Sequence, residues 1–169
     1  MTMRQIRLLG DPVLRTQTEP VTAFDAGLRE LVTDLMDTLL GAPGRAGVAA
    51  PQIGVSLRLF VYDAGGHRGH LVNPVLSGHA GMQEDEEACL SLPGLSFPTP
   101  RAMSVTATGV DQHGEPVTIA ASGFLARALQ HETDHLDGRL YIEALRGATR
   151  RAALREVRRL LPAGPGGAR

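Results

Sequence analysis

The residues best suited to chemistry in this sequence form the pattern His131-Glu132-Thr133-Asp134-His135. On a helix, residues four positions apart project from one face, so both imidazole groups could bind one cation. Glu132 would then lie beside the metal without ligating it, where its carboxylate could accept a proton from an attacking water. The alternative interpretation is that both histidines are polar residues of a half-exposed helix that binds no metal.

A catalytic metal site also needs a third protein ligand and an open position for water. Glu143 is the only carboxylate soon after Gly138, which ends the predicted helix, and the other candidate is Cys89, the sole cysteine. Cys89 lies in a segment rich in proline and glycine, where an irregular backbone could direct its side chain. Because a lone cysteine can also be a small buried hydrophobe, the residues alone leave the third ligand open.

Three segments of the chain resemble the motifs of the peptide deformylases. Arg45-Ala-Gly-Val-Ala-Ala-Pro-Gln52 is similar to the family's Gly-x-Gly-apolar-Ala-Ala-x-Gln motif. Glu87-Ala-Cys-Leu-Ser91 is similar to Glu-Gly-Cys-Leu-Ser, and Gln130-His-Glu-Thr-Asp-His-Leu-Asp-Gly138 to Gln-His-Glu-x-x-His-Leu-x-Gly. The resemblance extends from about Ile6 through the C-terminal helix. It implies hydrolysis of the N-formyl group from N-formylmethionyl termini of nascent polypeptides, with release of formate.

The resemblance also implies a role for each matching residue. The metal ligands would be Cys89, His131 and His135, and the proton-transfer residue would be Glu132. The Gln52 side-chain amide and the Leu90 backbone N–H would stabilise the oxyanion. The implied cofactor is one divalent metal ion per chain, expected to be Fe²⁺ in the cell, which Zn²⁺, Ni²⁺ or Co²⁺ can replace. We also expect substrate contacts from four residues that could equally be core: Gly47, Val48, Phe124 and Ala128.

Two positions depart from the family pattern. Arg45 and Ala88 stand where the motifs carry glycine. If the second glycine requires a positive φ, alanine would cost about 1 kcal/mol. Neither change touches a ligand, so we expect altered substrate fit rather than lost chemistry. Three alternatives remain: a catalytically weak or altered-specificity paralogue, a non-catalytic metal-binding protein, and a peptidase of the HExxH type, which lacks a convincing downstream ligand here.

The pattern of apolar residues predicts the elements that position these groups. Apolar residues at helical spacing predict helices over 25–40, with Asp25 as N-cap, and over 123–136, capped by Ser122. Strands are expected over 55–62, 70–75, 103–110 and near 117–119, and a last helix over 148–161. Residues 76–101 are expected to be irregular. The predicted fold is one α+β domain spanning 1–169, with mixed or antiparallel sheets packed around the central HExxH helix, an N-terminal and a C-terminal helix, and a flexible tail at 162–169.

Composition excludes several other classes of protein. The 169 residues carry a net charge of −1, which does not suggest a DNA-binding protein. No segment has the roughly 20 apolar residues of a membrane helix, and one cysteine cannot form an internal disulfide. We therefore expect a cytoplasmic protein with no membrane or DNA partner. The Arg-rich last helix is either a solvated amphipathic face or a contact with ribosomal RNA; its arginines are Arg146, Arg150, Arg151, Arg155, Arg158 and Arg159.

Overall fold

A computed structural model describes residues 3–161, so the tail predicted at 162–169 lies outside the described residues. The helices are α1 (Ala26–Leu40), α2 (Gly123–Leu136) and α3 (Gly147–Leu160). The strands are β1 (Gly47–Ala49), β2 (Leu59–Ala64), β3 (His67–Ala80), β4 (Gln83–Cys89), β5 (Leu92–Arg101), β6 (Ser104–Val110) and β7 (Pro116–Ser122). Short 3₁₀ helices cover Pro12–Arg15, Ala50–Ile53 and Tyr141–Glu143.

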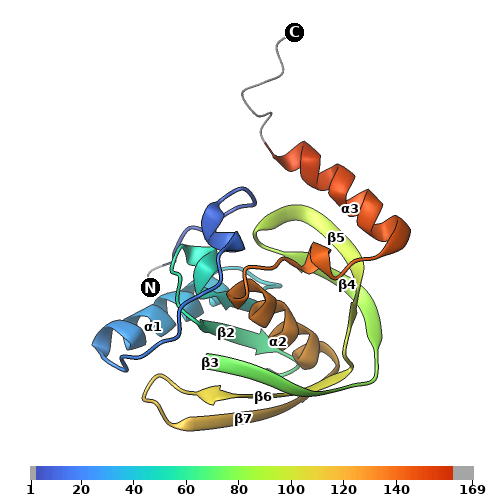
Figure 1. Cartoon of the computed structure of the whole chain (residues 1–169). Helices are drawn as coiled ribbons and strands as arrows, with labels where there is room; N and C mark the ends of the chain where they lie inside the picture. The colour runs from blue at the N-terminus through green and yellow to red at the C-terminus, as the bar shows by residue number, and fades with distance from the viewer. Residues whose placement is uncertain (1–2, 162–169) are drawn as a thin grey trace.

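The strands form two antiparallel sheets. Five strands pair in the order β1-β2-β3-β6-β7, and β4 and β5 pair with each other. Figure 1 shows α2 lying across the large sheet, with the β4–β5 ribbon beside it and α3 next to β5. The predicted α+β fold, with sheets packed around the HExxH helix, is confirmed. Every pairing between the named strands is antiparallel.

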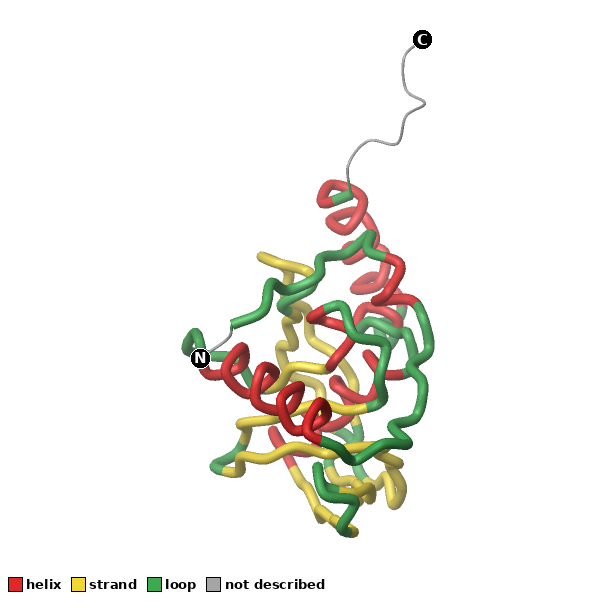
Figure 2. Tube along the Cα trace, turned by 90° about the vertical axis from the view of Figure 1, so that its left-hand side faces the viewer, coloured by secondary structure: helices red, strands yellow, loops and turns green. Residues whose placement is uncertain are grey.

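The large sheet is covered by a different helix on each face. Successive residues of a strand point to opposite faces, and in β2 Phe60 and Tyr62 pack in the cluster that contains α2. Leu59 and Val61 pack instead in the cluster that contains α1. Figure 2 shows α1 running along the outside of this layer. Full burial of each large apolar side chain contributes about 1.5–3 kcal/mol, so the sheet holds both helices in fixed positions.

The three predicted helices are confirmed, but only one of the two predicted caps is. The Asp25 carboxylate accepts a hydrogen bond from the Leu28 N–H at 3.1 Å. Ser122 occupies the N-cap position of α2 without a side-chain capping hydrogen bond, so that capping prediction was wrong. After α2, Gly138 has φ +68°, and a Cβ there would lie 2.8 Å from the Arg15 backbone. Glycine is therefore required by conformation and by space where the helix ends.

The prediction that residues 76–101 are irregular was wrong. β3 continues to Ala80, and β4 and β5 form an antiparallel ribbon whose register is regular from Gln83 to Ala88 and shifts between Ala88 and Cys89. The buried residues of β4 include Gln83, Glu87 and Cys89, so its alternation is not one of apolar residues. Prolines are tolerated in β5 because a two-stranded ribbon leaves each strand one unpaired edge. Cys89 is consequently directed by its position as the last residue of a strand, where the β4–β5 register shifts.

No helix within the described residues is both long enough and apolar enough to cross a membrane.

Candidate metal centre and active site

Cys89, His131 and His135 come together as one buried cluster. Cys89 ends β4, and both histidines lie on the inner face of α2 at the predicted i, i+4 spacing. One ligand atom from each residue lies within 4.8 Å of the others. Cys89 Sγ is 3.3 Å from His135 Nε2. Glu143, the other candidate ligand, lies outside this cluster, where it pairs with Arg15.

The chemistry of this donor set fits a divalent metal. Burial of Cys89 opposes ionisation, but the charge of His135 and hydrogen bonds from both histidines outweigh it, so the thiol pKa lies well below its usual value. His131 Nδ1 lies 2.6 Å from Glu87 Oε1, which leaves Nε2 to act as the ligand atom. A thiolate and two imidazoles suit Zn²⁺, Fe²⁺ and similar ions.

Glu87 anchors a buried ionic network behind His131. Its carboxylate accepts hydrogen bonds from Arg101 at 2.6 and 3.1 Å and from Arg127 at 2.7 Å. Although burial alone would raise the pKa of Glu87, bonds from His131 and Arg101 lower it to about 2. Arg101 also pairs with Asp134 at 2.6 Å. The carboxylate is thus ionised and fixed, and it holds the His131 ring in orientation.

This network was missed in the sequence, although one signal was available. Glu87 precedes Cys89 by two residues, and alternation along a strand places such residues on the same face. A strand prediction for this segment would therefore have placed Glu87 beside the metal ligand. Arg101 and Arg127 carry no comparable local signal, because their approach to Glu87 depends on how β4 pairs with β5 and packs on α2.

Glu132 is the acid/base candidate, and it is 3% exposed. Burial raises its pKa to about 7, although the charges of His131 and His135 favour the ionised form. Oε2 has no hydrogen-bond partner among the described residues. A carboxyl group with a pKa near neutrality can both accept and return a proton. Gly47 closes over it: a Cβ there would lie 2.6 Å from Glu132 Cδ.

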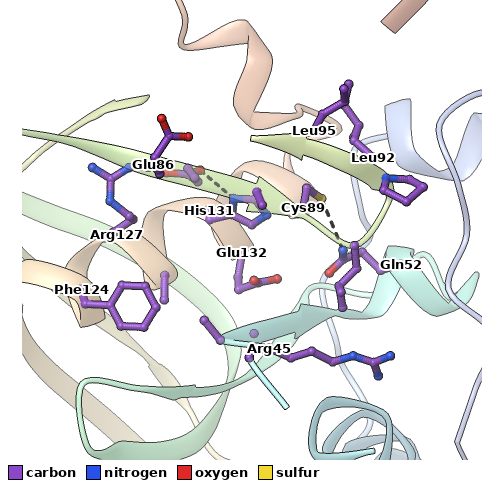
Figure 3. Close-up of a pocket in the computed structure, with 18 of the residues that line it drawn as sticks. Arg45, Gln52, Glu86, Cys89, Leu92, Leu95, Phe124, Arg127, His131 and Glu132 are labelled. Carbon is purple, nitrogen blue, oxygen red and sulfur yellow. Dashed lines mark hydrogen bonds and ion pairs between the residues drawn. The ribbon is translucent and has the colours of Figure 1, made fainter. Parts of the chain in front are cut away.

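Gln52 is held so that its amide N–H₂ faces the cluster. Its Oε1 accepts a hydrogen bond from the Ala49 N–H at 2.9 Å, which fixes the orientation of the amide. Nε2 lies 3.3 Å from Ser91 Oγ and 3.7 Å from Cys89 Sγ. Figure 3 marks the interaction between Gln52 and Cys89 with a dashed line. Leu90 lines the same cavity. The structure therefore brings both predicted oxyanion residues to the metal cluster.

A cavity of about 450 Å³ opens onto these groups. Of the four residues for which substrate contacts were expected, Gly47, Phe124 and Ala128 line it. Val48 does not line it, because its side chain is fully buried in the core between the sheet and α1. Arg45 and Ala88, the two departures from the motif pattern, also line the cavity. Ala88 lies in β4 and does not have a positive φ, so the strain considered for it is absent.

Comparisons with known proteins agree with this geometry. The family described as polypeptide deformylase matches residues 3–151. A peptide deformylase of Acidothermus cellulolyticus is 56% identical over 158 residues, which cover 94% of this chain and 87% of that protein. The crystal structure of a peptide deformylase from Legionella pneumophila is similar at a TM-score of 0.85 and 42% identity, covering 94% of this chain and 95% of that one.

The crystal structure of the peptide deformylase from Thermus thermophilus is also similar. Its TM-score is 0.86 at 39% identity, and the match covers 94% of this chain and 97% of that chain. Both the sequence match and the structural match span β4, α2 and the cluster between them, and this chain belongs to the polypeptide deformylase family.

Proposed function

We propose that this protein hydrolyses the N-formyl group from N-formylmethionyl termini of nascent polypeptides and releases formate. The observation that carries the proposal is the position of Glu132, which shares one cavity with Cys89 and His131 and has a pKa of about 7. Family membership supports this activity over a weak or altered-specificity paralogue. Cys89 in place of a downstream ligand distinguishes the site from that of an HExxH peptidase.

Cys89, His131 and His135 would hold one divalent metal ion, which we propose is Fe²⁺ in the cell and which Zn²⁺, Ni²⁺ or Co²⁺ could replace. When bound, such an ion acidifies water and polarises a carbonyl oxygen. Glu132 accepts the proton of the attacking water as the water oxygen bonds to the formyl carbon. It then delivers the proton to the methionine nitrogen as the C–N bond breaks, so that a neutral amine and formic acid leave, and the acid ionises to formate by passing its proton to the amine or to solvent.

Gln52 and Leu90 stabilise the charge that develops on the formyl oxygen. Gln52 is already oriented by its hydrogen bond to Ala49, and preorganised donors lose little energy to reorganisation during the reaction. Each such donor is worth about 3 kcal/mol of the activation barrier. The Leu90 backbone N–H would be the second donor, beside the thiolate of Cys89.

We propose that the substrate lies extended along β1. This strand is an edge of the large sheet, and an edge strand can pair with an added peptide. Gly47 and Val48 would contribute backbone only, since the Val48 side chain is in the core. Phe124 and Ala128, on the cavity side of α2, would contact the methionine side chain.

We further propose that the chain acts as one catalytic domain over 1–169 in the cytoplasm, where nascent chains emerge, and that α3 contacts the ribosome. Arg151, Arg155 and Arg158 are exposed on α3, whereas Ala153 and Val157 dock the helix on the core. Replacing these three arginines with glutamine should weaken sedimentation with ribosomes and reduce its salt dependence, because each phosphate contact contributes about 0.9 to the salt slope. Binding that is insensitive to salt or to these changes would contradict the ribosome contact.

The enzymatic proposal is tested with protein purified without oxygen and loaded with iron or nickel. We expect formate release from formyl-Met-Ala. Glu132→Ala should retain the metal and lose activity, whereas Cys89→Ala should lose the metal. Air should inactivate the iron form faster than the zinc form, because iron and its thiolate ligand are both redox-active. Metal-loaded protein that releases no formate from any formyl-methionyl peptide would overturn the activity, and equal decay in air would contradict the assignment of iron chemistry.

A further inference from the structure

Arg45 places a positive charge on the rim of the cavity, at a position where the deformylase motif carries glycine. Its side chain is half-buried, and its Nη1 donates a hydrogen bond to the Thr38 carbonyl in the last turn of α1. Within residues 3–161, no carboxylate lies within ion-pair distance of the Arg45 guanidinium. The charge is therefore fixed in place and not neutralised by a neighbouring acid in this part of the chain.

The geometry of β1 sets the direction in which a bound peptide leaves the site. Gly47 lies against Glu132, so the formyl end of the substrate is level with Gly47. A bound peptide cannot extend toward Ala49, because Ala49 and Ala50 are fully buried and the Ala49 N–H donates a hydrogen bond to Gln52. In the other direction Gly44 is exposed and lines the cavity. A peptide extended along the edge therefore runs antiparallel to β1 and passes Arg45.

The spacing of an extended chain then places Arg45 next to a particular part of the substrate. Each residue of a strand advances about 3.4 Å, and Arg45 is two residues from Gly47. The Arg45 backbone is consequently level with the second or third residue of the peptide, and its guanidinium, bonded to the Thr38 carbonyl, lies one side-chain length from that point. In Figure 3 the Arg45 side chain extends away from Phe124 and from Glu86, the exposed acid on the opposite wall. Glu86 accepts a hydrogen bond from Ser96 in its own ribbon.

We propose that Arg45 is a specificity-determining residue, which makes this deformylase favour formyl-methionyl peptides with an acidic residue at position two or three over peptides with a basic residue there. The inference rests on the proposed function. An acidic side chain at either position lies within about one Debye length of the guanidinium. Attraction of the acid and repulsion of the base both act before and during the reaction, so the effect appears in kcat/KM.

The test compares kcat/KM for formyl-Met-Ala-Asp-Ala with that for formyl-Met-Ala-Lys-Ala, and repeats the pair with the charged residue at position two. We expect the Asp peptide to be favoured about fivefold near 20 mM salt, with the ratio falling toward one near 0.5 M. Arg45→Lys should keep the preference, Arg45→Gln should remove it, and Arg45→Glu should reverse it. The matched control is Arg68→Gln, which removes an equal charge from the exposed β2–β3 hairpin and should retain the wild-type ratio.

The quantity compared is the ratio of kcat/KM for the Asp peptide to kcat/KM for the Lys peptide. A substitution that damages folding or the metal centre lowers both values equally and leaves this ratio unchanged. A ratio of one in the wild-type protein, or a preference that survives in Arg45→Gln, overturns the role of Arg45 while leaving the deformylase activity intact. An equal loss of preference in Arg68→Gln also overturns it, because the effect would then follow net charge and not position. Failure to turn over any of the four peptides overturns the proposed function instead.

Discussion

Replacing Gly47 with alanine should displace Glu132 and slow the reaction. A Cβ at position 47 would lie 2.6 Å from Glu132 Cδ and 2.7 Å from Cγ, whereas ordinary contact begins at 3.4 Å. Glu132 Oε1 would be closer still, so the carboxyl group must move by at least about 0.8 Å, the difference between the Cδ distance of 2.6 Å and ordinary contact at 3.4 Å. A misplacement of about 1 Å typically costs about 100-fold in rate, which is about 2.7 kcal/mol. We expect a loss of kcat/KM of this size.

Stability measurements can show that the clash with Glu132 is the cause. Overpacking at a buried site costs about 1–3 kcal/mol, so Gly47→Ala should lower the free energy of unfolding in urea by that amount. In a Glu132→Ala background the clashing atoms are absent. The same substitution should then be neutral or stabilise by up to about 1 kcal/mol, because alanine restricts the unfolded chain more than glycine does. The difference between the two backgrounds is the coupling energy of the pair.

Metal content serves as the control for this experiment, since the three atoms nearest to a Cβ at position 47 all belong to Glu132 and none to the clustered Cys89, His131 and His135. The single variant should bind metal as the wild-type protein does. The reasoning is refuted if Gly47→Ala keeps wild-type kcat/KM, or if its loss of stability persists in the Glu132→Ala background.

Three further predictions concern the groups around the metal. Glu87→Gln should weaken metal affinity about 10–100-fold in a chelator titration, because the carboxylate that orients His131 is lost. It should also destabilise the fold by about 3–5 kcal/mol, because Arg101 and Arg127 lose their buried counter-charge. Wild-type metal affinity in this variant would contradict the role of Glu87 in orienting His131. Gln52→Ala should lower kcat by about 100-fold or more with metal still bound, and unchanged kcat would exclude Gln52 as an oxyanion donor. In protein kept with free metal at 100 times its Kd, removing the metal should lower the free energy of unfolding by about 2.7 kcal/mol. Cys89→Ala should abolish this difference in stability. An equal difference in that variant would argue against Cys89 as a ligand.

The helical spacing of apolar residues correctly predicted α2, the helix that carries both histidines. Leu125, Leu129 and Leu136 are buried on α2 at helical spacing, so an apolar stripe and the i, i+4 histidines agreed on one helix. The third ligand could not be chosen from local pattern. Cys89 and Glu143 are both plausible ligands by chemical type, and only the packing of β4 on α2 separates them, by bringing the thiol to the histidines and leaving Glu143 with Arg15.

The β4–β5 ribbon was not predicted from the sequence, because polar residues of the candidate site occupy the buried positions of β4. A half-buried strand is recognised by apolar residues at every second position, but the inward positions of β4 are occupied by Gln83, Glu87 and Cys89. These polar groups are buried because they bind one another and α2: Gln83 donates to the Gly123 carbonyl at 2.8 Å, and Glu87 binds His131. The residues that build the active site thus replace the residues that would have revealed the strand.

Ala88 and Arg45, the two departures from the motif pattern, differ in what they add to the site. Ala88 lies between Glu87 and Cys89, is exposed, and lines the cavity with an uncharged methyl group. Its backbone is extended, and exchange of glycine for alanine in such a strand requires no unusual φ. Arg45 instead adds a charge at the cavity rim, beside the edge strand along which we expect the peptide to lie. Both residues line the cavity, and neither is a member of the metal-ligand cluster. Selection among substrates is therefore the step at which we expect this chain to differ from its relatives, and we propose Arg45 as the residue that carries the difference.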